Sequence, residues 1–320
     1  MSNHLDAPPP DTDARIAMTA HPPALSTDPA TPQRAPAAVF GSVREFRFER
    51  RHFDLIVGLL HQLAGIALAP HKAEMVYARL ARRLRELRLP DFDAYCALLR
   101  DEGGAREIGF LVNALTTNLT SFYRESHHFD FLAATVLPEV RALNAGRPKP
   151  RLRLWSAGCS SGPEPYTMAM VLVSTMGTEL RRWNARILAT DIDTHMVDTA
   201  RRGIYPLSGA TGIPPAIRQR FTQDIRLNGE PAVAMGEDLK RLVTVKPLNL
   251  LEHWPMTGPF DAIFCRNVLI YFDRRGRTQV IENFARMLRP GGYLFLGHSE
   301  SLYGVSSLFR QAGPTIYRRD

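Results

Sequence analysis

The spacing of apolar residues predicts helices in the first patterned region of the chain. Apolar side chains recur at helical spacing from Phe53 to Leu63, and the next three segments repeat that period. These further helices are predicted over Lys72–Leu87, Phe92–Arg100 and Ile108–Leu115. We therefore expect residues 41–115 to form a small all-helical domain.

From residue 151 onward, short apolar runs alternate with helical segments. The predicted strands are an apolar run at Leu152–Trp155, then Arg186–Asp193, Leu242–Leu250, Phe260–Tyr271, one after a Pro-Gly-Gly turn within Arg286–Gly297, and a closing strand at Thr315–Arg318. The fourth of these is nearly all apolar, as in a strand buried on both faces. Such alternation is typical of an α/β protein with a mostly parallel, doubly wound sheet that binds a nucleotide-like ligand at its carboxyl edge. Residues 151–320 are expected to form this domain.

Three stretches lack a clear period. Residues 1–40 are rich in Pro, Ala, Thr and Asp, so we expect disorder there. Residues 116–150 are interpreted as a linker and a connecting helix. Residues 201–240 contain five glycines and few apolar runs. An insertion of this length is usually functional, and we expect a small antiparallel subdomain over the site.

Composition limits the class of protein. The 320 residues suffice for two domains, and the net charge of +8 suggests an acidic partner. The three cysteines are far apart, which is typical of a reducing cytoplasm and makes a metal site unexpected. Neither an export signal nor an apolar run of membrane-spanning length is present, so we expect a cytoplasmic protein without membrane insertion.

Positive charge is concentrated in the second predicted helix. Residues 72–88 contain six basic and two acidic side chains. Arg79, Arg82 and Arg83 are expected on neighbouring positions of one face. A solvated helix face and a docking surface for an acidic partner are both compatible with this pattern.

The stretch Leu152–Met170 reads as strand, glycine turn and helix. Gly158 and Gly162 bracket a loop of small residues, which is a weak signal by itself because an ordinary strand–helix turn has the same composition. A stronger signal is Asp191, at the end of the second strand, where an acidic residue typically holds ribose hydroxyls. Asp193 is the alternative candidate for capping the next helix.

The polar stretch Thr116–Glu125 has no period and suits an ordered segment that covers a ligand. The alternative is that Asn118 and Thr120 cap the helix that follows. His127 and His128 lack a metal-ligand spacing and are interpreted as structural.

Five segments, in this order, carry a resemblance to a known family. They are TTNLTSFYRE, WSAGCSSGPEPYTMAM, ATDID, CRNVLIYF and GHSES. Together they resemble the CheR chemoreceptor glutamate methyltransferases of bacterial chemotaxis, over roughly residues 45–320. The resemblance implies a class I, Rossmann-like methyltransferase. It would transfer a methyl group from S-adenosylmethionine (SAM) to receptor glutamates.

Residue roles also follow from the resemblance. It implies that Arg124 meets the methionine carboxylate of SAM, that Glu164 takes its ammonium and that Asp191 holds its ribose. The remaining positions implied for the cofactor are Asn118, Thr120, Asn249, Leu250, Arg266 and Asn267. Arg124 and Tyr271 are the residues expected to orient the incoming carboxylate, with core packing as the alternative for Tyr271.

One segment departs from the family pattern. Some members carry closely spaced glycines followed by basic residues, which dock a receptor C-terminal pentapeptide. Here the corresponding stretch, Thr222–Asp238, leans acidic and its glycines are seven apart. We therefore expect no binding of that peptide.

Other functions are less compatible with the sequence. A nucleic-acid amino-group methyltransferase usually has an Asn/Asp-Pro-Pro-aromatic turn where this chain has Cys265–Val268. A small-molecule methyltransferase would not explain the basic helix. A non-catalytic cofactor sensor would not need all of Arg124, Glu164, Asp191 and Tyr271.

Overall fold

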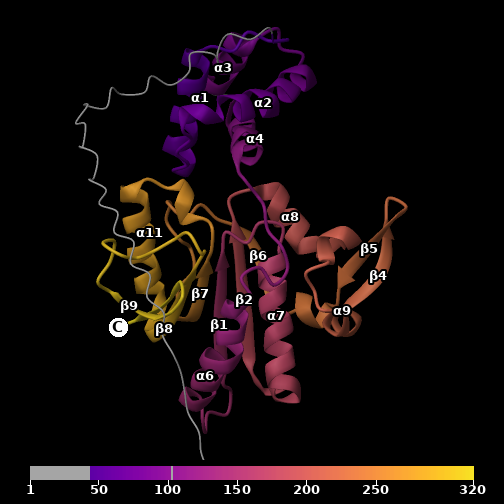
Figure 1. Cartoon of the computed structure of the whole chain (residues 1–320), viewed down its shortest axis with the longest axis vertical. Coiled ribbons are helices and arrows are strands. Elements are labelled where there is room, and N and C mark those ends of the chain that lie inside the picture. The colour runs from indigo at the N-terminus through magenta and orange to yellow at the C-terminus, as the bar shows by residue number, and fades with distance from the viewer. Residues whose placement is uncertain (1–43, 102–103) are drawn as a thin grey trace, which may run out of the picture. The chain divides into compact units, whose positions relative to one another are not determined.

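The structure is a computed structural model that describes residues 44–101 and 104–320. The proline-rich segment 1–40, for which disorder was predicted, lies outside the described residues. Figure 1 shows the elements by label.

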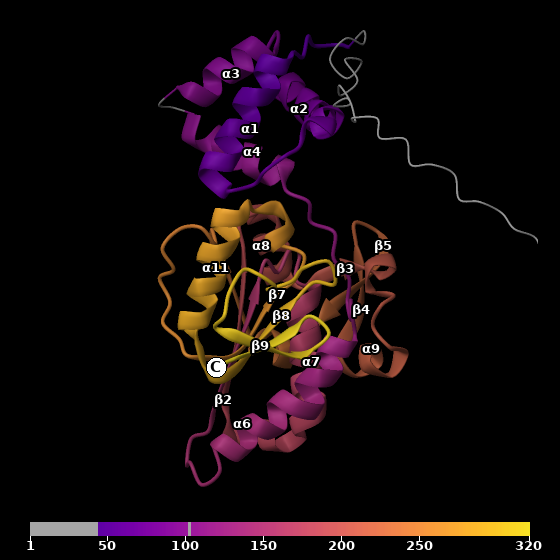
Figure 2. The ribbon, with the colours of Figure 1, turned by 60° about the vertical axis from the view of Figure 1, so that its left-hand side comes forward.

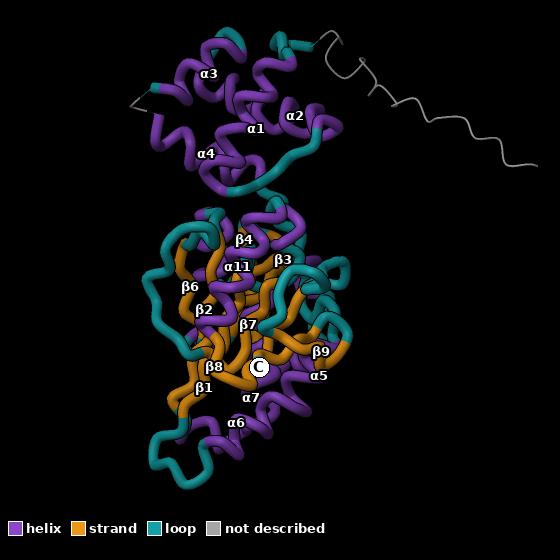
Figure 3. Tube along the Cα trace, turned by 90° about the vertical axis from the view of Figure 1, so that its left-hand side faces the viewer, coloured by secondary structure: helices purple, strands orange, loops and turns teal. Residues whose placement is uncertain are grey.

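The N-terminal described region is all-helical, as the periodicity predicted, and Figure 3 shows helices and loops in it. Its elements are α1 (Arg50–Ala64), the 3₁₀ turn η2 (Pro70–Lys72), α2 (Ala73–Leu87), α3 (Phe92–Arg100) and α4 (Ala105–Leu115). Apolar residues from all four α-helices form one buried cluster, with Ile56, Leu80 and Leu84 fully buried within it. Asp91 caps α3 by accepting a hydrogen bond from Ala94 N.

A connecting segment leads into the sheet. It consists of α5 (His127–Phe131), the π-helical turn η4 (Leu132–Val136) and α6 (Leu137–Leu143). His128 is fully buried and Nε2 lies 2.9 Å from Thr315 Oγ1, so this histidine has the structural role that the sequence suggested.

In the described part of the chain, seven strands form the main sheet, in the order β6-β2-β1-β7-β8-β10-β9. The strands are β1 (Arg151–Ala157), β2 (Asn184–Asp191), β6 (Val243–Pro247), β7 (Phe260–Cys265), β8 (Leu288–Leu296), β9 (Phe309–Gly313) and β10 (Ile316–Arg319). The first five strands in this order pair in parallel, and β10 is antiparallel to both of its neighbours. The doubly wound α/β prediction is therefore confirmed.

Helices cover both faces of this sheet (Figures 1 and 2). The helices between strands are α7 (Pro163–Met176), α8 (Thr194–Arg202) and α11 (Arg274–Met287), with the 3₁₀ turn η5 (Gly177–Arg182) following α7. Ala262 and Phe264 of β7 pack in the cluster that contains α7, whereas Ile263 and Cys265 pack in the one that contains α11. Because successive strand residues face opposite sides, every residue of β7 is buried, as its apolar run predicted.

The inserted segment forms a second, three-stranded antiparallel sheet, order β3-β5-β4. Its elements are β3 (Ile204–Pro206), the 3₁₀ turn η6 (Leu207–Ala210), α9 (Pro215–Phe221), β4 (Thr222–Leu227), β5 (Glu230–Met235) and α10 (Glu237–Lys240). The antiparallel prediction is confirmed. None of residues 201–240 is among those that line the cavity described below, and the expected place of this subdomain over the site stays a prediction.

Two strand predictions need correction, and one observed strand was not predicted. The strand predicted over Phe260–Tyr271 ends at Cys265, because Asn267 takes a left-handed conformation (φ 60°) and residues Leu269–Tyr271 form the 3₁₀ turn η7. The Pro-Gly-Gly segment lies within β8, where a register shift against β7 accommodates the extra residues. Strand β9 was not predicted, since its residues alternate poorly.

Candidate active site

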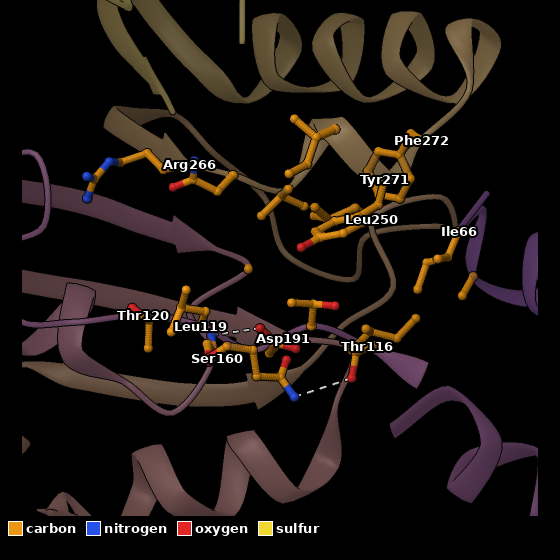
Figure 4. A pocket seen from close by; sticks show the side chains of 18 of the residues that line it. Ile66, Thr116, Leu119, Thr120, Ser160, Asp191, Leu250, Arg266, Tyr271 and Phe272 are labelled. Atoms are coloured by element: carbon orange, nitrogen blue, oxygen red, sulfur yellow. Dashed lines mark hydrogen bonds between the residues drawn. The ribbon is translucent and has the colours of Figure 1, made fainter. Parts of the chain in front are cut away.

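A cavity of about 300 Å³ lies where strands β1, β2, β6 and β7 end (Figure 4). All ten residues that were predicted to bind cofactor or orient the carboxylate line it: Asn118, Thr120, Arg124, Glu164, Asp191, Asn249, Leu250, Arg266, Asn267 and Tyr271. Residues Ala64, Ile66 and Leu115 of the helical region also contribute to its wall. The structure therefore brings five separated sequence segments to one site.

Gly158 allows the β1–α7 loop to turn at the floor of the cavity. Its φ of +85° is a left-handed conformation, and a Cβ there would lie 2.3 Å from Val268 Cγ2. Any other residue would be strained and would clash with the loop after β7. The glycine turn is thus needed for close packing of two loops of the site.

Asp191 is the buried acid at the end of β2. Its Oδ2 accepts a hydrogen bond from Ser160 N (2.7 Å) and its Oδ1 accepts one from Asp193 N (2.9 Å). Burial raises the pKa of Asp191 to about 6, although these backbone donors lower it. Each carboxylate oxygen retains a lone pair for a further donor in the cavity. Asp193 instead caps α8 by accepting from His195 N and Met196 N, as the alternative interpretation predicted.

Glu164 and Arg266 form a buried ion pair. Glu164 Oε2 accepts from Arg266 Nη1 (3.0 Å), and Oε1 accepts from the Ser156 hydroxyl (2.7 Å). Burial raises the pKa of Glu164, while Arg266 and Ser156 act in the opposite direction. The Arg266 side chain is only 3% exposed, and it also donates to the backbone carbonyl of Arg124. Arg266 therefore holds the site together and has little surface left for a ligand.

The segment between α4 and α5 forms one wall of the cavity. Asn118 Nδ2 donates to Asp193 Oδ2 (2.7 Å), and the Asn118 carbonyl accepts from the Ser160 hydroxyl (2.9 Å). Asn118 is thus tied to the strand ends and does not cap α5, whose N-cap residue, Ser126, makes no side-chain cap. Of the two interpretations, the structure favours a segment that encloses the cavity.

Arg124 sits between two residues with left-handed backbone, Tyr123 (φ 54°) and Glu125 (φ 53°). Its Nη1 donates to the Leu119 carbonyl (2.9 Å), and its Nε lies 3.9 Å from Glu125 Oε1. Paired strain of this kind concentrates at functional sites, where surrounding contacts hold it in place. The remaining N–H groups of the guanidinium are available to a carboxylate.

Tyr271 lines the cavity from η7, on the side opposite Asp191 in Figure 4. Its ring packs partly against the core of the helical region. The Tyr271 hydroxyl has no hydrogen-bond partner within residues 44–101 and 104–320. A half-buried hydroxyl of this kind can both pack, as the alternative interpretation held, and donate to a ligand.

Hydrogen bonds between the helical region and the segments after β6 and β7 hold the Tyr271 side of the cavity in place. Asn249 Nδ2 donates to the Leu63 carbonyl (2.8 Å), and Ala67 N donates to the Tyr271 carbonyl (3.0 Å). Leu250 is buried. Asn249 thus joins the end of α1 to the loop after β6, a structural task that the sequence did not indicate.

The three docking candidates lie outside the cavity wall. Arg79 Nη1 donates to the carbonyls of Ala114 (3.0 Å) and Thr116 (2.7 Å). Arg83 forms a two-pronged ion pair with the buried Glu107 and lies over the Phe110 ring. Arg82 points outward, with 81% of its side chain exposed and Glu86 as its partner. Two of the three arginines predicted for docking are therefore engaged in contacts within the protein.

Sequence reasoning missed several residues of the site. Ser160 and Thr116 line the cavity, as does His298, which belongs to the GHSES segment but was given no role. Glu300 of the same segment is buried and accepts from the backbone N–H groups of Gly297, Asn267 and Ile270. Glu300 thereby shapes the loop that carries Asn267 and Tyr271. The available signal in the sequence was an acidic residue in a short polar segment directly after an apolar strand.

Within the described residues, the structure contains no group of three or more His, Cys, Asp or Glu side chains placed to hold a metal ion. A search of the same residues for a helix long and apolar enough to cross a membrane also finds none.

Two family models match the chain over nearly all of its described length. The CheR methyltransferase all-alpha domain matches residues 51–116, and the CheR methyltransferase SAM binding domain matches residues 118–318. "Chemotaxis protein methyltransferase 2" of Pseudomonas aeruginosa is 44% identical over 89% of this chain and 99% of its own length. The "Chemotaxis protein methyltransferase" of Escherichia coli is 43% identical over 83% of this chain and 90% of its own length. The chain therefore belongs to the CheR methyltransferase family.

Proposed function

We propose that this chain methylates glutamate side chains of chemoreceptors with SAM as methyl donor and releases glutamate methyl esters. The observation that carries the proposal is the grouping of three complementary charges in one cavity. Asp191 and Glu164 lie on its inner wall, and Arg124 lies on the wall formed by residues 116–124.

The side chains present fit SAM. Asp191 suits the two ribose hydroxyls, because its carboxylate can accept further hydrogen bonds. Glu164 suits the ammonium group, and Arg124 suits the methionine carboxylate by a charge-assisted contact. When bound, SAM supplies a methyl group already activated by the sulfonium. The protein then needs to provide alignment and a dry cavity, since a glutamate carboxylate is ionised at neutral pH.

Arg124 and Tyr271 are the candidates for orienting the acceptor carboxylate. Both line the cavity, and both present donors that no described residue fully occupies. Donors that hold one carboxylate oxygen leave the other free to attack the methyl carbon. Neither residue has to remove a proton, so the proposal requires no general base.

For receptor docking, we propose the outward face of α2. Arg79 and Arg83 are committed to internal contacts, whereas Arg82 and Arg85 are more than half exposed. The glutamate-rich helical bundle of a receptor would meet these charges, which mainly raise the encounter rate. In this proposal the helical domain binds the receptor, and the sheet domain transfers the methyl group.

We further propose a cytoplasmic location, and we expect no binding of a receptor pentapeptide. The three cysteines are free and buried, which suits a reducing compartment. The β4–β5 hairpin carries Asp224 and Glu230 on exposed positions, and its one basic side chain, Arg226, donates to the Gly229 carbonyl of the turn.

The test of the function is methyl transfer to receptor-containing membranes from SAM labelled in the methyl group. Label on receptor glutamates that mild base releases would support the proposal. Transfer to lipid, nucleic acid or a small molecule alone would contradict it.

A further inference from the structure

His298 lies on the cavity wall, and the roles proposed above do not involve it. Its Nδ1 is 3.2 Å from Glu125 Oε1, and 70% of its side chain is exposed. The same oxygen lies 3.9 Å from Arg124 Nε. One carboxylate thus holds both an arginine and a histidine at the cavity.

Glu125 is the centre of this arrangement. Its side chain is only 12% exposed, and Oε2 lies 3.3 Å from Arg266 Nη2 and 3.6 Å from His128 Nδ1. Burial acts to raise the pKa of Glu125, but the Arg266 guanidinium and the hydrogen bond with His298 outweigh it and lower the pKa. Glu125 is therefore ionised and can only accept, so Nδ1 of His298 must carry a proton and donate it.

The other ring nitrogen of His298 has no partner. Within the described residues, Nε2 receives or donates no hydrogen bond, and most of the ring is open. The Glu125 carboxylate binds Nδ1 and thereby fixes the orientation of the ring, as a carboxylate commonly does for a functional histidine. The free nitrogen is thus a prepared contact point for a ligand.

The ion pairs that meet at Glu125 and Arg266 are balanced without His298. Arg124 and Arg266 carry two positive charges, and Glu125 and Glu164 carry two negative ones. A substrate carboxylate entering beside Arg124 would add a negative charge to this group. A protonated His298 would compensate for it.

We propose that His298 is a substrate-binding residue whose imidazolium donates Nε2–H to the carboxylate of the substrate glutamate, while Glu125 holds Nδ1. The inference rests on the proposed function, since it assigns a residue to its acceptor substrate. Together with Arg124, His298 fixes one oxygen of the carboxylate and leaves the other free to react.

The groups that lie close to the Glu125 carboxylate, besides the His298 ring, are Arg124, Arg266 and His128. His128 is neutral, because burial lowers its pKa to about 3.

The experiment compares His298→Ala and His298→Gln with the parent in receptor methylation, after methylation by the parent has been established. His298→Ala should raise the receptor KM about tenfold, as expected for the loss of a hydrogen bond to a charged group. His298→Gln keeps an N–H donor and should recover part of this loss. The affinity for SAM, measured by calorimetry without receptor, should be unchanged in both variants.

His253→Ala is the matched control, because His253 is exposed but does not line the cavity. Its KM should equal that of the parent. An unchanged KM in His298→Ala would overturn the inference, as would an equal loss of SAM affinity, which would place His298 at the cofactor. If the parent methylates no receptor, the proposed function itself fails.

Discussion

At the scale of single residues, the site depends on carboxylates held in low-dielectric surroundings. Asp191 is bound by two backbone N–H groups, yet burial still raises its pKa to about 6. Such a group is ionised at neutral pH but close to titration. Hydroxyl donors from a ligand would stabilise its charged form and release a proton on binding.

The first prediction concerns this proton. Binding of SAM should weaken as the pH falls below about 6, by up to tenfold per pH unit, because protonated Asp191 must ionise before it accepts the ribose. Asp191→Ala should weaken binding at neutral pH by about 1–3 kcal/mol. Calorimetry at pH values between about 5 and 8 measures both effects.

Asp191→Asn is the control for the pH effect, since its amide does not titrate. A dependence that persists in this variant would have to come from another group, such as Glu164, whose pKa burial also raises. An affinity that stays constant across this range in the folded parent would remove Asp191 from the ribose site.

The second prediction concerns Tyr271. Tyr271→Phe should lower kcat more than it lowers the affinity for SAM, because the free hydroxyl would act on the acceptor carboxylate in the transition state. The ring and its packing against the helical core are retained in this variant. If Tyr271→Phe turns over like the parent, the residue serves packing only.

At the scale of elements, α2 shows how a charge pattern can mislead. The sequence placed Arg79, Arg82 and Arg83 on one face, and periodicity alone could not distinguish solvent from internal acceptors. The acceptors of Arg79 and Arg83 are Thr116 O and Glu107, more than 20 residues away in the chain. Arg82, in contrast, keeps the exposure that docking requires.

The third prediction separates these roles. Arg82→Glu should raise the receptor KM several-fold at low salt with unchanged stability, and the difference should shrink as salt screens the charge over about 8–10 Å. Arg83→Ala should lower the free energy of unfolding by about 2–4 kcal/mol, because the buried Glu107 would lose its cationic partner and keep only the Tyr95 hydroxyl. Urea denaturation and receptor kinetics measure the two effects.

Arg147→Glu is a matched control, because Arg147 is exposed in the loop between α6 and β1. It carries the same charge reversal away from α2. Equal KM values for Arg82→Glu and Arg147→Glu would show that α2 is an ordinary solvated face.

The fourth prediction concerns the β4–β5 hairpin. A synthetic pentapeptide with a receptor C-terminal sequence should show no measurable binding, because the turn at Asn228-Gly229 is followed by Glu230 and not by basic residues. Micromolar binding that an Asp224→Lys or Glu230→Lys substitution alters would reverse this expectation.

At the scale of the whole molecule, most of the fold followed from local patterns. Helical spacing in residues 53–115 and apolar strands with glycine turns are signals that neighbouring residues carry by themselves. The residues predicted to bind the cofactor all line one cavity, and each lies at the end of a predicted strand or in a distinctive segment. Their convergence on one cavity follows from the parallel order of β6, β2, β1 and β7.

Contacts between distant segments could not be predicted. His61 meets Asp273, Asn249 meets Leu63, and Glu300 binds the backbone of Asn267, over separations of 212, 186 and 33 residues. Contacts between residues so far apart in the chain produce no periodic pattern in the sequence. The end of β7 at Cys265 could not be predicted for the same reason, because the distant Glu300 holds the turn that follows this strand.

The central claim is methyl transfer to receptor glutamates, and one measurement tests it most directly. The purified protein is incubated with receptor-containing membranes and SAM tritiated in the methyl group, and the receptor is then treated with mild base. We predict label on the receptor that is released as methanol, and that is lost when the acceptor glutamates are changed to alanine. Label that is stable to base, or no transfer by a folded protein that binds SAM, would contradict the account.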